Sequence, residues 1–115
     1  MKPTLKALAQ ATATYCDIPY EELVGRSRKR TASDPRHTFW YVARHGVGHT
    51  LSHIGRWSDR DHTAVLYGAN KMIGRVSSST TRRIIEEATE LDQLMRQRVR
   101  DEVNRTWGTN YDPKR

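Results

Sequence analysis

Residues 51–69 read LSHIGRWSDRDHTAVLYGA, and this stretch predicts two short helices joined by a tight turn. Ser52 is the candidate N-cap of the first helix, because its hydroxyl can accept a free backbone N–H of the first turn. Ile54 and Trp57 are three residues apart and therefore share one face of that helix. The residue types around Asp59 are typical of a turn, so a second helix is expected to follow it.

The second helix is expected to begin just after Asp61, whose carboxylate can cap it. Val65, Ala69 and Met72 recur at helical spacing and are expected to be buried. The polar residues near its start are then left exposed, and they are Arg60, Asp61, His62, Thr63 and Tyr67.

This arrangement is the layout of a helix-turn-helix, whose second helix places its N-terminal residues in the major groove of DNA. Thr63 offers a methyl group to thymine and a hydroxyl to a base or a phosphate. Asp61 can accept a hydrogen bond from cytosine N4, and Arg60 can donate two to guanine or bind a phosphate. His62 can donate or accept. These residues are therefore the candidate readers of a DNA sequence.

The run RDHTAVL at residues 60–66 closely resembles the signature of the C-terminal DNA-binding domain (domain IV) of DnaA, the bacterial chromosomal replication initiator. Upstream, Leu51 and the pair at 54–55 are similar to the family's leucine and its E-I-G turn, with His53 in the glutamate position. The basic run at 26–30 and the Pro-Arg pair at 35–36 also resemble the family. The likeness spans roughly residues 4–75.

The resemblance implies an all-α fold, a helix-turn-helix bundle of the DnaA C-terminal or Trp-repressor-like type. We expect about five short helices, followed by one long helix at the C-terminal end. The resemblance also implies sequence-specific binding of double-stranded DNA at DnaA-box-like sites, in the initiation of DNA replication or in its regulation.

Residues 26–34 read RSRKRTASD and predict a polar, basic loop. The resemblance aligns Arg28 with the family arginine that enters the minor groove, where narrow A·T-rich DNA concentrates negative potential. Arg26, Lys29 and Arg30 are expected to bind phosphates. A basic loop that touches only phosphates is the simpler alternative, and a nuclear-localisation signal is a weaker one.

Two helices are expected before this loop, over residues 3–16 and 20–24. Pro3 and Pro19 suit helix starts, and Gly25 suits a helix end.

A third helix is expected from Pro35 to about His45, with Asp34 as its N-cap. Its buried face is expected to hold Phe39, Val42 and Ala43, with Trp40 beside them. The residues left to bind phosphates are Arg36, His37 and Arg44, together with Ser52 of the helix-turn-helix.

Several positions depart from the family pattern. Asp34 stands where the family often has a basic residue, which removes one phosphate contact. Ala64 replaces a second threonine, and Tyr67 replaces a common histidine. The turn after Trp57 is one residue shorter than usual. We therefore expect the preferred DNA sequence to differ from the standard DnaA box.

The charge of the chain favours a polyanionic partner. Its 115 residues suffice for one modest domain, and they include 20 Lys and Arg against 13 Asp and Glu, a net charge of +7. Residues 1–75 hold twelve basic and six acidic residues, whereas residues 76–115 hold eight and seven. The excess therefore accompanies the helix-turn-helix, although charge alone would also fit a solvated basic face.

The single cysteine, Cys16, cannot form an internal disulfide, which fits the reducing interior of a cell. No apolar run approaches the ~20 residues that span a bilayer, and the N-terminus lacks the apolar core of a signal peptide. We expect a cytoplasmic, nucleoid-associated protein that makes no membrane contact.

His45, His49 and His53 are four residues apart and would line up as metal ligands on one continuous helix. Gly46 and Gly48 are expected to interrupt that helix, and no cysteine or carboxylate completes a ligand set. No metal and no cofactor are expected.

Residues 80–106 predict one long amphipathic helix that follows a serine-rich stretch. Its apolar stripe consists of Ile84, Ala88, Leu91, Met95, Val99 and Val103. This stripe either folds back onto the first domain or pairs with a second copy or another protein. The expected division is a domain at 1–75, the helix within 76–107 and a flexible tail at 108–115.

No motif indicates an enzyme. The phosphate-loop pattern G-x-x-x-x-G-K-[ST] is absent, so the ATPase module of a complete initiator is not expected. Asp61 and His62 make a poor acid/base pair, because adjacent helical residues point about 100° apart. The leading hypothesis is a small stand-alone DNA-binding protein. The alternatives are a transcriptional regulator, a protein–protein adaptor that uses the long helix, and an RNA binder that uses the basic loop.

Overall fold

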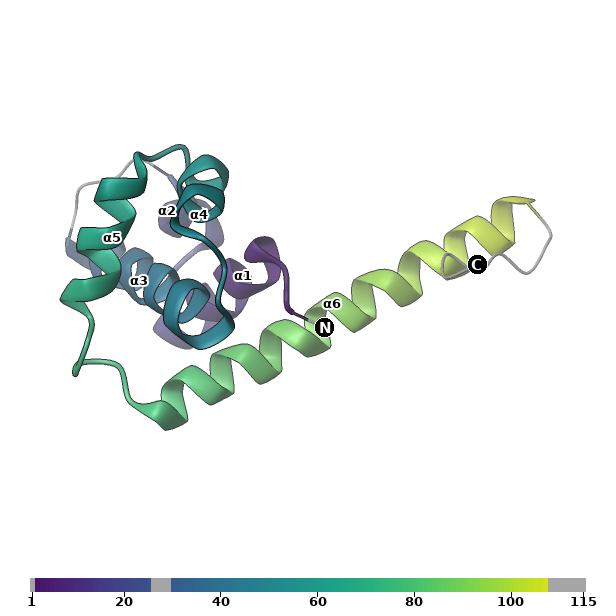
Figure 1. The fold of residues 1–115 in the computed structure, drawn as a ribbon. Coiled ribbons are helices and arrows are strands. Elements are labelled where there is room, and N and C mark those ends of the chain that lie inside the picture. The colour runs from purple at the N-terminus through teal and green to yellow at the C-terminus, as the bar shows by residue number, and fades with distance from the viewer. Residues whose placement is uncertain (1, 26–29, 108–115) are drawn as a thin grey trace.

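The computed structural model describes residues 2–25 and 30–107, and at 30, 31, 106 and 107 it describes the backbone alone. All regular secondary structure in this part of the chain is helical, which confirms the predicted all-α class. Short helices surround one core, and a single long helix runs along the bundle and out beyond it (Figure 1). The molecule measures 50 × 27 × 27 Å along its principal axes.

The first two helices match the prediction closely. Helix α1 (Leu5–Cys16) begins two residues later than expected, because the Thr4 hydroxyl accepts a hydrogen bond from the Ala7 N–H at 3.2 Å and caps the helix. It ends at Asp17, which adopts a left-handed conformation with φ 57°. Helix α2 (Tyr20–Val24) ends at Gly25, as predicted.

Helix α3 (Arg30–Tyr41) begins earlier than the sequence suggested. The expected loop over residues 26–34, with Asp34 as N-cap, is therefore wrong from Arg30 onward. Ala32 is only 1% exposed and Pro35 is buried, so packing against the core keeps this first part helical. Pro35 costs one backbone hydrogen bond, because it lacks the N–H that would bond the carbonyl four residues earlier.

The helical backbone ends two residues after the predicted end near His45, but its last part is a π-helical segment, η1 (Val42–Val47), which continues α3. The Gly48 N–H donates to the Ala43 carbonyl at 3.1 Å, five residues back instead of four. Gly48 itself is left-handed at φ 94° and ends the segment. A Cβ at Gly46 would lie 2.9 Å from the Thr81 methyl group, so this glycine permits the close approach of the long helix.

The predicted helix-turn-helix is present as α4 (Leu51–Ser58) and α5 (His62–Lys71). The expected cap at Ser52 is wrong, since Thr50 caps α4 by accepting from the His53 N–H at 3.1 Å. Gly55 permits the tight turn, because a Cβ there would lie 2.7 Å from the Arg60 carbonyl oxygen.

The core joins these helices through the residues that helical spacing had selected. The buried set includes Phe39, Trp40, Val42, Ala43, Ile54, Val65, Ala69 and Met72. Leu8 and Ala9 of α1 are also fully buried. The apolar faces of the third and fifth predicted helices are therefore confirmed.

The long helix α6 (Ser78–Trp107) begins two residues before its predicted start and ends one residue after its predicted end. Its first half folds back: Ile84 and Ala88 are fully buried in the shared core. The Asp92 carboxylate then accepts hydrogen bonds from the Thr4 N–H and hydroxyl, both at 2.8 Å. The predicted folding back is therefore confirmed for the first half of the helix. The predicted domain boundary at residue 75 stays a prediction.

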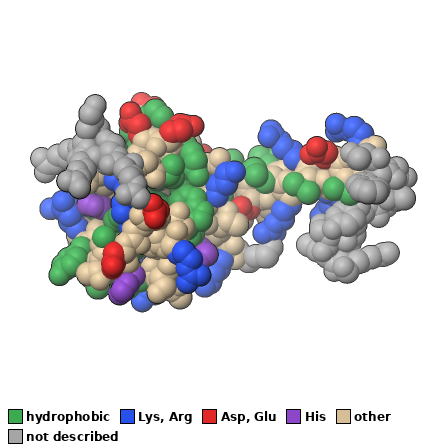
Figure 2. All heavy atoms as spheres, turned by 90° about the horizontal axis from the view of Figure 1, so that it is seen from above, with side chains coloured by type: hydrophobic (Ala, Val, Ile, Leu, Met, Phe, Trp, Pro, Cys, Tyr) green, Lys and Arg blue, Asp and Glu red, His purple; other side chains and the backbone are tan. Residues whose placement is uncertain are grey.

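The second half of α6 projects from the bundle (Figure 1). Leu94, Met95 and Val99 are 59%, 46% and 56% exposed there. Figure 2 shows hydrophobic side chains along this rod, among basic and acidic ones. No helix in the described part of the chain is both long and apolar enough to cross a lipid bilayer.

Candidate nucleic-acid interface

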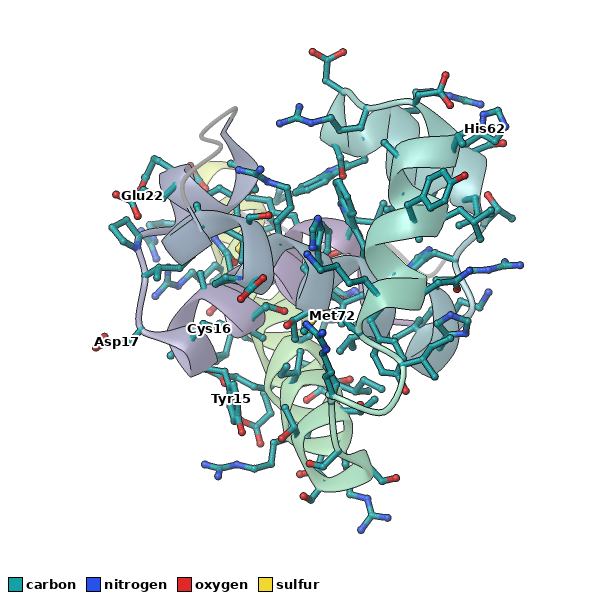
Figure 3. The ribbon with its side chains drawn as sticks, turned by 90° about the vertical axis from the view of Figure 1, so that its left-hand side faces the viewer. Tyr15, Cys16, Asp17, Glu22, His62 and Met72 are labelled. Carbon is teal, nitrogen blue, oxygen red and sulfur yellow. The ribbon has the colours of Figure 1, made fainter. Side chains whose placement is uncertain are left out.

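The start of α5 presents its polar side chains to solvent. The side chains of Asp61 and His62 are 70% and 65% exposed, and Thr63 is exposed as well. Figure 3 shows His62 at the outer end of α5, far from Met72 at the other end of that helix. Tyr67, one turn beyond Thr63, is 74% exposed. These four side chains lie where a helix-turn-helix meets the major groove.

Asp61 is the N-cap of α5, as predicted: its Oδ1 accepts a hydrogen bond from the Thr63 N–H at 2.8 Å. This bond holds the pKa of the Asp61 carboxyl below its usual value, and the nearby His62 lowers it further. The carboxylate retains lone pairs that an outside donor such as cytosine N4 can use.

Asp61 and His62 do meet, contrary to the sequence argument. Their Oδ1 and Nδ1 atoms lie 3.4 Å apart. The 100° separation applies to two helical residues, but Asp61 is a cap with an extended backbone at ψ 142°. Both side chains are widely exposed, so the contact orients them at the surface and forms no enclosed acid/base site.

Arg60 is turned toward the protein. Its guanidinium donates to the carbonyl oxygens of Ser58 at 3.3 Å, Asp59 at 3.2 Å and Gly25 at 3.1 Å. The side chain is half-buried. In this arrangement the fork that would read guanine is occupied by backbone carbonyls.

Arg36 is buried, at 8% exposure, and its predicted phosphate contact is not supported. Its Nε donates to the Leu23 carbonyl at 2.8 Å, and its Nη2 donates to those of Glu22 at 3.1 Å and Gly25 at 2.6 Å. These carbonyls end α2, where the last turn has no helical donors. Burial, together with the neighbouring charge of Arg60, lowers the pKa of Arg36.

His37 also faces the interior more than expected. It is half-buried, its ring centroid lies 5.5 Å from that of Trp40, and its Nδ1 has no hydrogen-bond partner among the described residues. Burial lowers the pKa of His37, and Lys71 adds to that effect while Asp34 opposes it. This environment disfavours the charged form of His37, and with it an ion pair between His37 and a phosphate.

Two further predicted phosphate ligands lie at the surface. Arg44 is exposed and donates from Nη1 to the His49 carbonyl at 3.4 Å, and Ser52 is exposed on α4. The basic residues Arg26, Arg28 and Lys29 lie outside the described residues, as does the side chain of Arg30. Their DNA contacts stay predictions.

The three spaced histidines belong to different local structures. His45 lies in η1, His49 follows it, and His53 is in α4. The His49 Nε2 lies 2.9 Å from the Pro3 carbonyl oxygen, a hydrogen bond that ties this segment to the N-terminus. Within residues 2–25 and 30–107 no group of three or more His, Cys, Asp and Glu residues is placed to hold a metal ion.

Two structural features of this region were not predicted from the sequence. The Gly25 carbonyl is a shared acceptor for Arg36 and Arg60, and a backbone carbonyl leaves no mark in a sequence. Gly68 lies in the middle of α5, where a Cβ would meet the Trp40 ring at 2.5 Å. A glycine inside a predicted helix is a signal of close packing that could have pointed to this crossing.

The helix-turn-helix of α4 and α5, with the exposed start of its second helix, defines a helix-turn-helix DNA-binding domain. Comparison with known families matches residues 5–72 to the family described as the bacterial dnaA protein helix-turn-helix. Because the match covers more than half of the 115 residues, the chain belongs to this family. The resemblance carried by residues 60–66 is thereby confirmed. The domain of this family binds double-stranded DNA in replication initiation.

Proposed function

We propose that this protein binds double-stranded DNA sequence-specifically, at sites similar to the DnaA box. Asp61, His62 and Thr63 read base edges in the major groove, and Arg28 enters the adjacent minor groove. The observation that supports this assignment is the start of α5, where three polar side chains are exposed on a helix that is capped and firmly packed. Such rigidity matters because base readout requires a fixed geometry.

Around these contacts, phosphates are bound by flanking residues that fix the register without reading the sequence. The residues assigned to this role are Arg26, Lys29, Arg30, Arg44 and Ser52. Tyr67 lies on the same face of α5 as Thr63 and adds a contact at the edge of the groove.

We place the activity at the nucleoid, in replication initiation or its regulation. Binding uses only contacts of this domain and needs no nucleotide. A transcriptional regulator would use the same surface, and the genomic position of its sites separates the two roles: origin-proximal clusters indicate replication, and promoters indicate transcription.

The decisive experiment is selection of bound sequences from a random duplex pool, without nucleotide. Mobility shifts then compare the selected duplex, a scrambled duplex and an RNA of the same sequence over a range of salt concentrations. Specific complexes are typically at least about 10³-fold tighter than non-specific ones, so one duplex sequence should stand out clearly. Equal binding to the scrambled duplex, or a preference for RNA, would contradict the proposal.

The projecting half of α6 suggests a second role, pairing with another copy of the chain. Residues 90–105 hold four acidic and four basic residues, so two copies do not repel one another there. Within this segment, acidic Glu90 precedes basic Arg98 and Arg100. An antiparallel pair therefore places opposite charges side by side while it covers the exposed Leu94, Met95 and Val99.

A further inference from the structure

One backbone carbonyl oxygen is hydrogen-bonded to two arginines from distant parts of the chain. The Gly25 oxygen accepts hydrogen bonds from the Nη2 atoms of Arg36, at 2.6 Å, and Arg60, at 3.1 Å. Gly25 ends α2, Arg36 lies in α3, and Arg60 lies in the turn before α5. Three separate segments of the fold therefore meet at this oxygen.

The two arginines connect Gly25 to different parts of the fold. Arg36 also bonds the Leu23 and Glu22 carbonyls, so it fixes Gly25 relative to the end of α2. Arg60 also bonds the Ser58 and Asp59 carbonyls, so it fixes Gly25 relative to the turn of the helix-turn-helix. Two like charges converge here, and each is balanced by several carbonyl dipoles.

The position of this junction in the sequence gives it a functional meaning. Arg60 immediately precedes Asp61, the cap of the helix that reads the major groove. Gly25 immediately precedes the basic run that begins at Arg26. The Arg60–Gly25 bond therefore links the residue before the cap of α5 to the residue before the basic run.

We propose that Arg60 is a positioning residue that sets the separation between the recognition helix and Gly25, the residue from which the basic run departs. This inference rests on the proposed function, because it assumes that both elements contact one duplex. Arg60 then determines how far apart along the DNA the two contacts fall. It does so by bonding backbone carbonyls and without reading a base.

A fixed separation makes the protein sensitive to spacing in its site. One inserted base pair moves one contact about 3.4 Å along the helix axis and about 35° around it. A protein with a rigid link should reject this change, whereas a protein whose link is loosened should tolerate it. Spacing tolerance thus distinguishes positioning from base readout, which would change the preference at a single base pair.

The test starts from the site that the unmutated protein selects and from its footprint on that site. A second duplex carries one base pair inserted between the major-groove and minor-groove halves of the footprint. The dissociation constants for both duplexes are measured for the unmutated chain, Arg60→Ala, Arg60→Lys and Arg82→Ala. The last variant removes the same charge from an exposed position on α6, and thermal melting of each variant confirms that it is folded.

The unmutated chain and Arg82→Ala should keep the same preference for the intact spacing. In Arg60→Ala that preference should fall roughly tenfold, the scale of one lost charged hydrogen bond. Arg60→Lys should resemble the alanine variant, because the one nitrogen of an ammonium cannot replace the two separated nitrogens from which Arg60 donates.

Three results would overturn the inference: an unchanged spacing preference in folded Arg60→Ala, full recovery by lysine, or a changed preference at one base pair. The second would indicate a simple charge on a phosphate, and the third would indicate base readout. A failure of the unmutated chain to prefer any duplex would instead refute the proposed function itself.

Discussion

Trp40 and Gly68 are packed so closely that a Cβ added to Gly68 would lie 2.5 Å from the Trp40 Cε3 atom. This contact marks the crossing of α3 and α5, and Trp40 also donates from Nε1 to the Ser58 hydroxyl at the end of α4 at 3.2 Å. One buried indole ring therefore orients both helices of the helix-turn-helix.

Replacing Gly68 with alanine should destabilise the fold by about 1–3 kcal/mol, the usual cost of overpacking. The Trp40 ring is 3% exposed and has little room to move, so the cost outweighs the gain in helix propensity. The measurement is urea unfolding followed by tryptophan fluorescence. Asn70→Ala, at an exposed position of α5, is the matched control and should not lower the stability. A fully stable Gly68→Ala variant would show that the two helices are not held this closely.

Arg36 and Arg44 should separate a structural arginine from a surface one. Arg36→Ala removes three hydrogen bonds at the end of α2 and should lower the free energy of unfolding by about 1.5–3 kcal/mol. Arg44→Ala, at an exposed position, should change it by less than about 0.5 kcal/mol. Chemical denaturation of both variants provides the comparison. Equal stabilities would argue that the Arg36 guanidinium is not anchored inside.

Asp61 should make the stability of the protein depend on pH. Its pKa is lowered in the folded state, so its contribution is complete above the unfolded value of about 3.9 and is lost as the pH falls through the folded pKa. Asp61→Asn should therefore melt at a lower temperature than the unmutated protein at pH 7. That difference should narrow below about pH 4. A difference that persists undiminished at pH 2 would mean that the charge is not the cause.

Thr63 and Lys29 should have different effects on DNA binding. Thr63→Ala should cost about 1–3 kcal/mol on the selected duplex and little on a scrambled one, because it removes a base contact. Arg28→Ala should likewise erode the discrimination between duplexes. Lys29→Ala should weaken binding to every duplex and reduce the salt dependence by about one counterion. Mobility shifts at several salt concentrations measure both effects, and a uniform loss from Thr63→Ala would rule out its reading a base.

The projecting half of α6 should control the association of the chain with itself. Leu94→Glu combined with Val99→Glu places charges in the exposed apolar strip and should convert a dimer to a monomer in sedimentation measurements. The same variant should keep the melting temperature of the bundle, because neither side chain belongs to the core. Gln93→Glu, at an exposed position of the same segment, is the control for added charge. A monomeric unmutated chain at high concentration would refute the pairing.

Much of the fold was determined by local sequence. The helices at residues 5–16 and 20–24 and the long one from Ser78 were predicted within two residues, because caps, breakers and apolar spacing act over a few neighbouring positions. The cap at Asp61 and the burial of Val65 and Ala69 were predicted for the same reason. The exposed start of the recognition helix follows from these facts alone.

Only the tertiary structure decided where several side chains point. Arg36 and Arg60 were both assigned to DNA, but the carbonyls that bind them come from residues up to 35 positions away. The start of α3 at Arg30 likewise depends on the packing of Ala32 into the core. Sequence spacing determines which residues share a helix face, because that geometry is local. Whether a cation meets solvent or a buried carbonyl depends on contacts between distant segments, and those exist only once the chain has folded.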